Sequence, residues 1–323
     1  MVFFDVGDLS EHTDIKESYD MIIVGGGPAG MTAGLYAARG GLNALLIEKT
    51  VQGGQMARTQ MIENYPGFQQ INGSELSDRM KDHASYYGLQ FLPGEVTEIS
   101  INGREKEVST DEGRKIRAQV LIIATGAEHK KLGVPGEERL EGKGLSYCSI
   151  CDGPLFSGKD VVVIGGGNSA VDEAIYLSTI TNSVTIIHRR DRLRAEKVIQ
   201  DKAFANSKIR FQWNSIVEEF CGVSKLTHLR IKNKKTNELS ELFTDGAFVY
   251  VGLAPNSHLV QGIIPLDEDG FIPVDPQTLE TQCAGVFAVG DIVKKPIRQI
   301  VNAAADGALA ATMAIKAYFG EPS

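Results

Sequence analysis

The sequence predicts an α/β protein made of two Rossmann-like, three-layer nucleotide-binding domains, with the second domain inserted into the first. Two observations lead to this prediction. Glycine-rich turns that begin at Gly25 and Gly165 each join a short apolar strand to a helix, which is the order of a dinucleotide-binding βαβ unit. A chain of 323 residues, 42% of them hydrophobic, can also fill two cores of ordinary domain size.

The first domain begins with a buried strand over residues 19–24, and Pro28 opens a helix over 28–39. Proline suits the first helical turn because its missing N–H has no helical partner there in any case. The next strand is predicted over 43–48. Hydrophobic periodicity predicts further strands over 119–124 and 285–289 and an alanine-rich helix over 299–319.

The second domain repeats this order, with a strand over 160–164, a helix over 168–178 and strands over 184–188 and 248–251. Glycine and proline near 126–129 and 252–256 break the flanking strands, so we expect the chain to cross between the domains there. Residues 102–113 and 233–240 are polar and charged, and we predict turns between strands for both.

Composition limits the function. A net charge of −8 and a pI near 5.4 argue against a nucleic-acid partner, which needs a basic face. The longest apolar runs are strand-length, so no membrane span is expected. The acidic residues 1–20 do not resemble a signal peptide, and four cysteines are too few for a disulfide scaffold. We therefore expect a reducing, cytoplasmic location.

The first glycine turn predicts a dinucleotide site. Gly25 permits the tight turn, Gly27 lets the backbone approach a pyrophosphate, and Gly30 allows close packing of helix and strand. Glu48 follows at the end of the next strand, where a carboxylate can accept both ribose hydroxyls. An acid there suits FAD or NAD and repels a 2′-phosphate. An ordinary strand-to-helix turn is the alternative.

The second turn has Ala170 in place of its third glycine, and basic residues stand where the first has its acid. Arg189, with His188, Arg190 and Arg194 close by, should lie at the ribose 2′ position. Guanidinium groups bind phosphate in a bidentate manner, so this site favours NADPH over NADH. A solvated charge cluster is the alternative. Two nucleotides of different type imply a flavin that is reduced by a pyridine nucleotide.

Cys148 and Cys151 form a CxxC pair that predicts a redox dithiol. One thiolate would form a mixed disulfide, and the two-residue spacer keeps the second sulfur within reach to resolve it. Neither Cys221, Cys283 nor the histidines supply a second ligand pair for zinc, so we expect no metal. Inert structural thiols are the other alternative. Asp152 is a candidate proton donor and acceptor, or otherwise a simple turn residue.

These motifs together resemble the low-molecular-weight thioredoxin reductase family over about residues 19–319. The resemblance rests on the two glycine turns, the CxxC pair followed by Asp152 and Gly153, and the basic run 188–197. It also includes shorter matches at 53–55, 63–67, 124–126, 290–291 and 298–299. Three departures are the Ser-Ile spacer of the CxxC pair, the extension before residue 19 and Leu193 in place of a usual phenylalanine.

The resemblance implies which residues bind each cofactor. For FAD they are Gly25, Gly27, Pro28, Ala29, Gly30, Glu48, Gly54, Gln55, Asn64, Val96, Gly126, Gly290, Asp291, Arg298, Gln299 and Ile300. For NADPH they are Gly165, Gly167, Asn168, Ser169, Ala170, His188, Arg189, Arg190 and Arg194.

The predicted domains are an N-terminal extension (1–18), the FAD-binding domain in two parts (19–126 and 252–323) and the inserted NADPH-binding domain with its CxxC pair (127–251). By the same likeness Cys151 is the sulfur nearer the flavin, Cys148 attacks the disulfide of thioredoxin, and Asp152 is the acid and base. The family likeness also implies a homodimer and a hinge near Gly126 and Gly252.

The leading hypothesis is an NADPH-dependent thioredoxin reductase. A reductase of the same fold that serves a peroxiredoxin, or a dithiol oxidase that passes electrons to oxygen, is the enzymatic alternative. The retained arginine cluster argues against the oxidase. A redox-silent module that senses NADP(H) is a third hypothesis of another class, and the intact CxxC pair argues against it.

Overall fold

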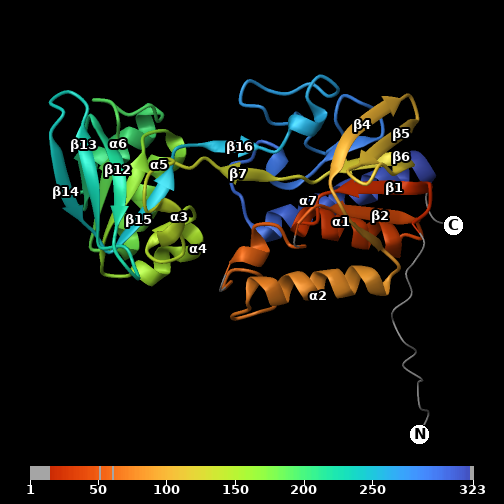
Figure 1. Ribbon diagram of the computed structural model, residues 1–323, viewed down its shortest axis with the longest axis horizontal. Coiled ribbons are helices and arrows are strands. Elements are labelled where there is room, and N and C mark those ends of the chain that lie inside the picture. The colour runs from red at the N-terminus through yellow and green to blue at the C-terminus, as the bar shows by residue number, and fades with distance from the viewer. Residues whose placement is uncertain (1–14, 51, 60–61, 321–323) are drawn as a thin grey trace, which may run out of the picture. The chain divides into compact units, whose positions relative to one another are not determined.

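The computed structural model describes residues 15–50, 52–59 and 62–320. Contacts within the chain divide it into two compact units, one formed by the residues up to 127 together with those from 255 onward, the other by residues 128–254. The predicted N-terminal extension lies outside the described residues as far as residue 14. Figure 1 shows the elements of both units.

The first unit is built on a seven-stranded sheet with the order β3-β2-β1-β6-β5-β4, and β17 pairs with β6 on a branch. Pairing is parallel among β3, β2, β1, β6 and β17, and antiparallel among β4, β5 and β6. The strands are β1 (Ser18–Val24), β2 (Ala44–Glu48), β3 (Gln90–Pro93), β4 (Val96–Asn102), β5 (Glu105–Thr110), β6 (Lys115–Ile123) and β17 (Val286–Ala288).

Strand β5 corrects the prediction of a turn over residues 102–113. Its alternating buried and exposed residues are typical of a strand, but the inward position of Lys106 hid that alternation. The Lys106 ammonium is buried, and it donates to the carbonyl oxygens of Gly103 at 3.3 Å and Arg104 at 3.2 Å. Strand β6 also begins four residues earlier than predicted, because its first half pairs with β5.

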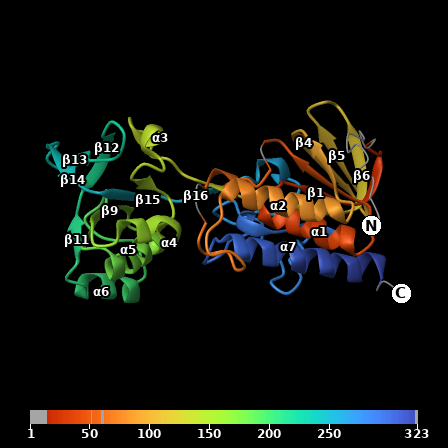
Figure 2. The same cartoon turned by 90° about the horizontal axis from the view of Figure 1, so that it is seen from below.

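Three helices cover one face of this sheet: α1 (Pro28–Arg39), α2 (Gly73–Tyr86) and α7 (Ile300–Ala314), the last continued by a π-helical turn, η5 (Ile315–Phe319). Figure 2 shows α1, α2 and α7 together on that face. Helices α1 and α7 pack closely because Gly307 has no side chain; a Cβ there would collide with the carbonyl oxygen of Ala29. The predicted helix over 299–319 is confirmed, with its last turn in π form.

The opposite face of the parallel strands packs against side chains of β4 and β5, which belong to the same sheet, and against the segment that precedes α7. Its core joins Ile22, Leu45 and Leu121 of the sheet with Val260 and Ile292. Short helices also occur in this unit: η1 (Met56–Arg58), η3 (His258–Val260) and η4 (Gly290–Ile292).

The second unit has a five-stranded parallel sheet with the order β11-β10-β9-β15-β8. Its strands are β8 (Leu145–Ser146), β9 (Asp160–Gly165), β10 (Ser183–Ile187), β11 (Ile209–Gln212) and β15 (Gly246–Tyr250). Helices α5 (Asn168–Ile180) and α6 (Lys197–Ala205) cover one face. The antiparallel strands β12 (Ser215–Cys221), β13 (His228–Asn233) and β14 (Leu239–Phe243) cover the other. This makes a three-layer unit, and the predicted turn over 233–240 is the β13–β14 hairpin.

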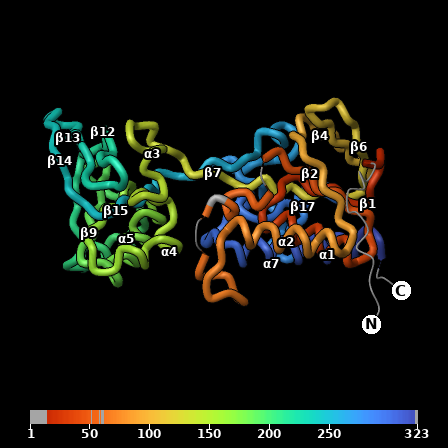
Figure 3. The backbone as a smooth tube through the Cα atoms, turned by 60° about the horizontal axis from the view of Figure 1, so that its bottom comes forward, coloured from red at the N-terminus to blue at the C-terminus, as the bar shows by residue number. Residues whose placement is uncertain are grey.

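The chain passes between the units along a two-stranded ribbon of β7 (Ala127–His129) and β16 (Leu253–Pro255), which Figure 3 traces as a tube. Short helices complete the second unit: α3 (Glu137–Leu140), α4 (Ser149–Asp152) and η2 (Gly153–Phe156). The predicted fold class, two Rossmann-like units with one inserted into the other, is confirmed. Among the described residues, no helix has the length and apolar character needed to cross a membrane.

Candidate active site

The turn between β1 and α1 contains two kinds of glycine, those that the fold itself requires and one that faces open space. Gly25 has φ +109°, and a Cβ there would collide with the carbonyl oxygen of Ala124, while a Cβ at Gly30 would collide with the carbonyl oxygen of Gly25. The fold itself requires glycine at both positions. Gly27 has φ −72°, and an added Cβ would have no protein atom within 4 Å. The turn therefore leaves open space at the amino end of α1, where N–H groups can bind phosphate.

Glu48 ends β2 beside this open space. Its Oε2 accepts the N–H of Gly26 at 2.6 Å, and its Oε1 accepts the N–H and the hydroxyl of Thr50, both at 2.8 Å. Each carboxylate oxygen has further acceptor capacity, so Glu48 can still accept ribose hydroxyls. The carbonyl of Glu48 accepts the N–H of Gly94 at 3.0 Å. Val96, buried at the start of β4, follows two residues later.

The segment after β2 returns to the same turn. Gly53 donates its N–H to the carbonyl of Gly26 at 2.8 Å. Gly54 has φ +55°, and a Cβ there would meet only Gly27, at 3.7 Å. Gly54 and Gly27 therefore border one open space. Gln55, next in sequence, donates its side-chain amide to the carbonyl of Ala127.

Strand β6 and η4 bring further predicted residues close. Gly126 has φ +70°, and its carbonyl accepts the N–H of Asn256 at 3.0 Å. Gly290 begins η4 with φ +73°, and a Cβ there would lie 3.0 Å from the Cβ of Ala29. Ala29 follows Pro28 in the first turn of α1. These contacts bring Gly290 to the amino end of α1.

The start of α7 gathers polar residues that have unused hydrogen-bonding capacity. Asn64 donates its side-chain amide to Oε1 of Gln299 at 3.0 Å, just before Ile300 begins the helix. The Arg298 guanidinium lies 5.4 Å from the ring centroid of Phe271, and its buried Nε has no hydrogen-bond partner among the described residues. An orphaned buried donor of this kind indicates an acceptor supplied by a ligand.

Asp291 lies in η4 near this cluster. Burial raises the pKa of Asp291, while Arg298 acts in the opposite direction and Asp306 in the same direction as burial. The Asp306 carboxylate is itself engaged, since it accepts the N–H of Gly290 at 2.9 Å and pairs with Lys295. Asp291 has no such hydrogen bond or salt bridge among the described residues, so its carboxylate can accept a hydroxyl from a ligand.

The glycine turn of the second unit repeats the pattern of the first. Gly165 has φ +156°, and a Cβ there would lie 2.5 Å from the carbonyl oxygen of Tyr250 and 2.6 Å from the Cβ of Ala170. Ala170, in the third-glycine position, therefore fits because Gly165 has no side chain. Gly167 has φ −90°, and an added Cβ would have no protein atom within 4 Å. Open space again lies at a helix amino end, here that of α5 with the exposed Ser169.

The basic segment after β10 is tied to this turn. The N–H of Arg194 donates to the carbonyl of Gly166 at 2.7 Å, and the side chain of Asn168 exchanges hydrogen bonds with Glu196, at 2.8 and 3.2 Å. Arg189, Arg190 and Arg194 are exposed, and none has a salt-bridge partner among the described residues. Leu193, one of the three departures from the family pattern, is buried in the core under α5 and α6.

His188 differs from the neighbouring arginines because its ring is 5% exposed and packs beneath the turn. A Cβ at Gly166 would collide with this ring. Burial lowers the pKa of His188, and Arg194, Arg189 and Arg190 act in the same direction, while a hydrogen bond with the Gly165 backbone acts against them. The ring is therefore neutral in the folded protein near neutral pH.

This burial predicts a loss of stability in acid. Below the unfolded pKa of about 6.5 the unfolded chain binds a proton at His188 that the folded chain resists. The stabilising contribution is present above that pH and is lost as the pH falls, by at most about 1.4 kcal/mol per pH unit. Urea unfolding at pH 7.5 and 5.5 should show a larger loss for the wild-type protein than for His188→Asn. Equal losses would contradict the assignment.

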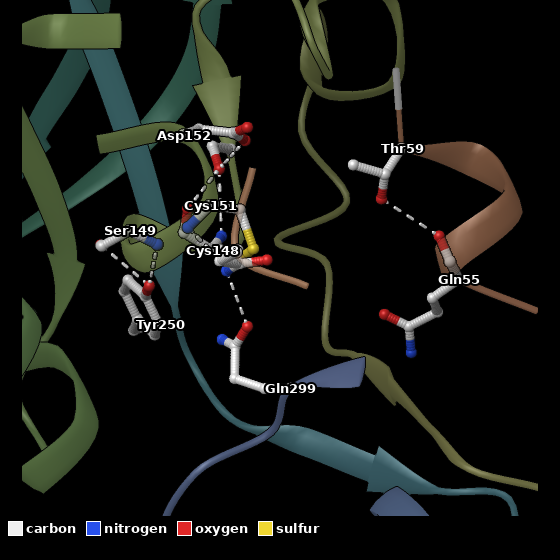
Figure 4. Close-up of a disulfide and its surroundings, with 10 residues drawn as sticks. Gln55, Thr59, Cys148, Ser149, Cys151, Asp152, Tyr250 and Gln299 are labelled. Carbon is white, nitrogen blue, oxygen red and sulfur yellow. Dashed lines mark hydrogen bonds between the residues drawn. A yellow bond between two sulfur atoms is a disulfide. The ribbon is translucent and has the colours of Figure 1, made fainter. Parts of the chain in front are cut away.

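The cysteine pair forms a disulfide in the second unit, with the two Cα atoms 5.3 Å apart. Cys148 precedes α4, and its Sγ accepts the N–H of Cys151 at 3.1 Å. Cys151 is exposed, and Cys148 is half-buried. Figure 4 shows the cystine with Ser149, Asp152 and Tyr250 around it. In the described part of the chain, no cluster of three or more His, Cys, Asp or Glu side chains could hold a metal ion.

Asp152 lies at the end of α4, directly after Cys151. Its Oδ2 accepts the hydroxyl of Ser146 at 2.6 Å, and the Ser146 Oγ accepts the N–H of Cys148 at 3.0 Å. Ser146 therefore links the carboxylate to the backbone of the first cysteine. A carboxylate held beside a cystine can accept or donate the proton of a thiol.

Sequence reasoning missed four residues around the cystine: Ser146, Ser149, Glu173 and Tyr250. Tyr250 ends β15 and donates its hydroxyl to Ser149 Oγ at 2.9 Å, while the Ser149 N–H donates to the Tyr250 oxygen at 2.7 Å. No local pattern marks Tyr250, because the bond spans 101 residues of sequence. The hydroxyl of Ser149 within the CxxC spacer was the one available signal.

The arrangement offers three chemical capacities. Each unit has a glycine turn whose middle glycine is open to a ligand, and the donors and acceptors beside the two turns differ in charge. The first has Glu48 and Asp291, while the second has three exposed arginines without a salt bridge in the described part of the chain. The second unit also holds a disulfide with an adjacent carboxylate. These are the elements needed to bind two dinucleotides and to exchange electrons with a thiol protein.

Comparisons with known proteins agree with this geometry. Residues 19–307 match the family described as pyridine nucleotide-disulphide oxidoreductase. The chain is 46% identical over 297 residues to the thioredoxin reductase of Bacillus subtilis (strain 168), covering 92% of this chain and 93% of that protein.

Two solved structures also match. The thioredoxin reductase of Streptococcus pyogenes MGAS5005 has a TM-score of 0.87 at 44% identity, covering 93% of this chain and 98% of that one. The thioredoxin reductase of Giardia duodenalis has a TM-score of 0.88 at 34% identity, covering 93% of this chain and 99% of that one.

Proposed function

The chain belongs to the pyridine nucleotide-disulphide oxidoreductase family, within its thioredoxin reductase group, and we propose that it transfers electrons from NADPH through FAD to the Cys148–Cys151 disulfide and on to thioredoxin. One observation supports this above the others. An intact disulfide beside Asp152 lies in the same unit as an open glycine turn and unpaired arginines. Once it is reduced to a dithiol, this cysteine pair can reduce the disulfide of a partner protein by thiol–disulfide exchange.

The first unit fits FAD. A bound flavin supplies a ring that accepts two electrons from a nicotinamide and donates them to a disulfide. The open space at Gly27 and Gly54 suits its pyrophosphate, and Glu48 and Asp291 can accept its hydroxyls. The orphaned Nε of Arg298 supports an acceptor at the start of α7. There the helix amino end would stabilise negative charge.

The second unit fits NADPH. Gly167 leaves room for the pyrophosphate at the amino end of α5, and Asn168 and Ser169 stand in the first turn of that helix. Arg189, Arg190 and Arg194 are free to bind the 2′-phosphate, which NADH lacks. His188 would act from beneath the turn, by holding Gly166 in place.

The disulfide then exchanges with thioredoxin. In the reduced enzyme the Cys148 thiolate attacks the disulfide of thioredoxin, so that a mixed disulfide forms and one sulfur of thioredoxin leaves as a thiolate. Cys151 attacks the Cys148 sulfur, which restores the Cys148–Cys151 bond and releases the second thiolate of thioredoxin. Asp152 would take the proton from the attacking thiol and return one to the leaving thiolate. This division of roles follows the family likeness.

We further propose that the enzyme acts as a homodimer in the reducing cytoplasm. The family likeness supports both statements, and an acidic chain with a dithiol suits a protein partner. Light scattering on the purified protein should give the mass of two chains. A monomer at micromolar concentration would contradict the dimer and leave the redox proposal intact.

A coenzyme and partner panel tests the function. The purified, FAD-loaded protein is mixed with NADPH or NADH and with a set of thioredoxins, and thiol formation is followed. NADPH-dependent reduction of at least one thioredoxin is expected. Rapid oxygen consumption without thioredoxin would show an oxidase instead, and turnover with a peroxiredoxin alone would show a different partner. Failure to bind flavin or NADPH would overturn the assignment.

Two glycine substitutions separate cofactor binding from folding. Gly27→Ala should leave the flavin-free protein stable, because its Cβ meets no protein atom, yet weaken FAD binding by at least about tenfold through contact with the pyrophosphate. Gly30→Ala should destabilise the fold by at least about 3 kcal/mol, because its Cβ collides with the Gly25 carbonyl. Thermal unfolding of the flavin-free protein and flavin titration measure both. Unchanged FAD affinity in Gly27→Ala would exclude that site.

A further inference from the structure

Behind the Cys148–Cys151 disulfide lies a polar group that the proposed reaction does not use. Ser149, inside the CxxC spacer, is fully buried. Its N–H donates to the Tyr250 oxygen at 2.7 Å, and its Oγ accepts the Tyr250 hydroxyl at 2.9 Å (Figure 4). Both hydrogen-bonding groups of Ser149 are thus held by one side chain from β15, so the backbone between the cysteines is fixed to the sheet.

Glu173 of α5 faces the same group. One of its carboxylate oxygens, Oε2, is buried and has no hydrogen-bond partner among the described residues. The charge that acts on it within the described structure is that of Asp172, which is also negative, and no cation offsets it. An ionised carboxylate with one buried oxygen unpartnered and no cation beside it is costly, so a bound proton is the physical outcome.

Burial favours the protonated forms of both Glu173 and Tyr250. Burial raises the pKa of Glu173, Asp172 acts in the same direction, and hydrogen bonding with Ser149 acts against them. Burial also raises the pKa of Tyr250, with Glu173 and Asp152 acting in the same direction. Asp172 is itself influenced by Lys202 and Glu196. Tyr250 therefore keeps its proton and remains a donor.

We propose that Glu173, Tyr250 and Ser149 form a positioning network behind the disulfide, in which Glu173 holds a proton while the disulfide is oxidised and the two hydroxyls fix the turn between the cysteines. This inference rests on the proposed function, because it concerns the same disulfide. A neutral Glu173 adds no negative charge near the sulfur that must become a thiolate. The fixed turn favours the oxidised geometry.

Infrared spectroscopy tests the proton directly. At neutral pH the oxidised wild-type protein should show the carbonyl band of a protonated carboxylic acid that is missing from Glu173→Gln. The matched control is Asp201→Asn, which removes one surface carboxylate of the same unit that pairs with Lys197. It should keep the band. A band that survives in Glu173→Gln, or no such band in the wild-type protein, would overturn the protonation of Glu173.

Equilibration with glutathione tests the positioning. Tyr250→Phe leaves the buried Ser149 N–H without its acceptor, so the disulfide should become about three- to tenfold easier to reduce. Ser149→Ala removes the hydroxyl alone, and a shift in the same direction is expected even if Tyr250→Phe fails to fold. The control Tyr147→Phe, next to Cys148, loses a buried hydroxyl that donates to Glu137 at 2.8 Å and not to Ser149. It should shift the equilibrium less than about twofold.

Equal shifts of the glutathione equilibrium in Tyr250→Phe and Tyr147→Phe would mean that any loss of protein stability changes the disulfide, and this result would overturn the network. The absence of a shift in both Ser149→Ala and Tyr250→Phe would overturn it as well. Neither measurement uses NADPH or thioredoxin. The protein can therefore fail as a thioredoxin reductase while the network is confirmed, and the reverse is equally distinguishable.

Discussion

Replacing Cys148 with serine is expected to abolish the reduction of thioredoxin by NADPH while the flavin is still reduced by the coenzyme. The serine hydroxyl cannot form a disulfide, so electrons that reach the flavin have no route to the partner. Thiol formation should fall by at least about a thousandfold, since the nucleophile of a coupled set is removed. Bleaching of the flavin absorbance under anaerobic conditions should follow NADPH addition at nearly the wild-type rate.

The free cysteines provide the control for this prediction. Cys221 and Cys283 are partly buried and unpaired with each other or with the active disulfide, so Cys221→Ser and Cys283→Ser should retain most of the thioredoxin activity. Cys151→Ser should lose it as Cys148→Ser does, because the mixed disulfide cannot be resolved. Turnover that persists in Cys148→Ser would remove the disulfide from the pathway.

Removing the basic cluster should erase the preference for NADPH. The double variant Arg189→Ala, Arg190→Ala loses two exposed guanidinium groups that have no salt-bridge partner in the described part of the chain and that can bind a 2′-phosphate. Charge-assisted hydrogen bonds of this kind contribute about 1.5–3 kcal/mol each, so kcat/KM for NADPH should fall by at least about two orders of magnitude. The value for NADH should change little.

Arg192→Ala is the matched control, because Arg192 is an exposed arginine of the same segment that is not predicted to bind the coenzyme. It should reduce kcat/KM for NADPH by less than about threefold, which is the size expected of an exposed charge that does not contact the phosphate. A uniform loss with both coenzymes in the double variant would mean that the arginines maintain the fold or a shared phosphate contact, and the NADPH assignment would be wrong.

The sequence predicts the elements that have strong local signals. The strands and helices around both glycine turns are predicted to within a few residues, because an apolar run, a turn of fixed glycine spacing and a helix opened by Pro28 or Asn168 are all local features. Strand β5 was missed because Lys106 occupies an inward position that a charged residue seldom takes. Only the structure shows the two backbone carbonyls that receive its ammonium.

The candidate site was also only partly predictable. Sequence spacing predicts the cysteine pair, the arginines and the glycine turns, but it does not predict the residues that contact them. Ser149 and Tyr250 meet only because β15 lies next to β9 in the sheet, with Tyr250 paired to Gly165. Glu173 is one of two adjacent acids on α5, and only burial distinguishes it from the exposed Asp172. Contacts of this kind depend on the fold.

An anaerobic titration of the FAD-loaded protein with NADPH, followed by oxidised thioredoxin, tests the electron path most directly. We expect about two equivalents of NADPH to be consumed, one for the flavin and one for the disulfide. Oxidised thioredoxin should then recover those electrons as thioredoxin thiols. Consumption of a single equivalent, with flavin bleaching but no new thiols and no electrons delivered to thioredoxin, would contradict it.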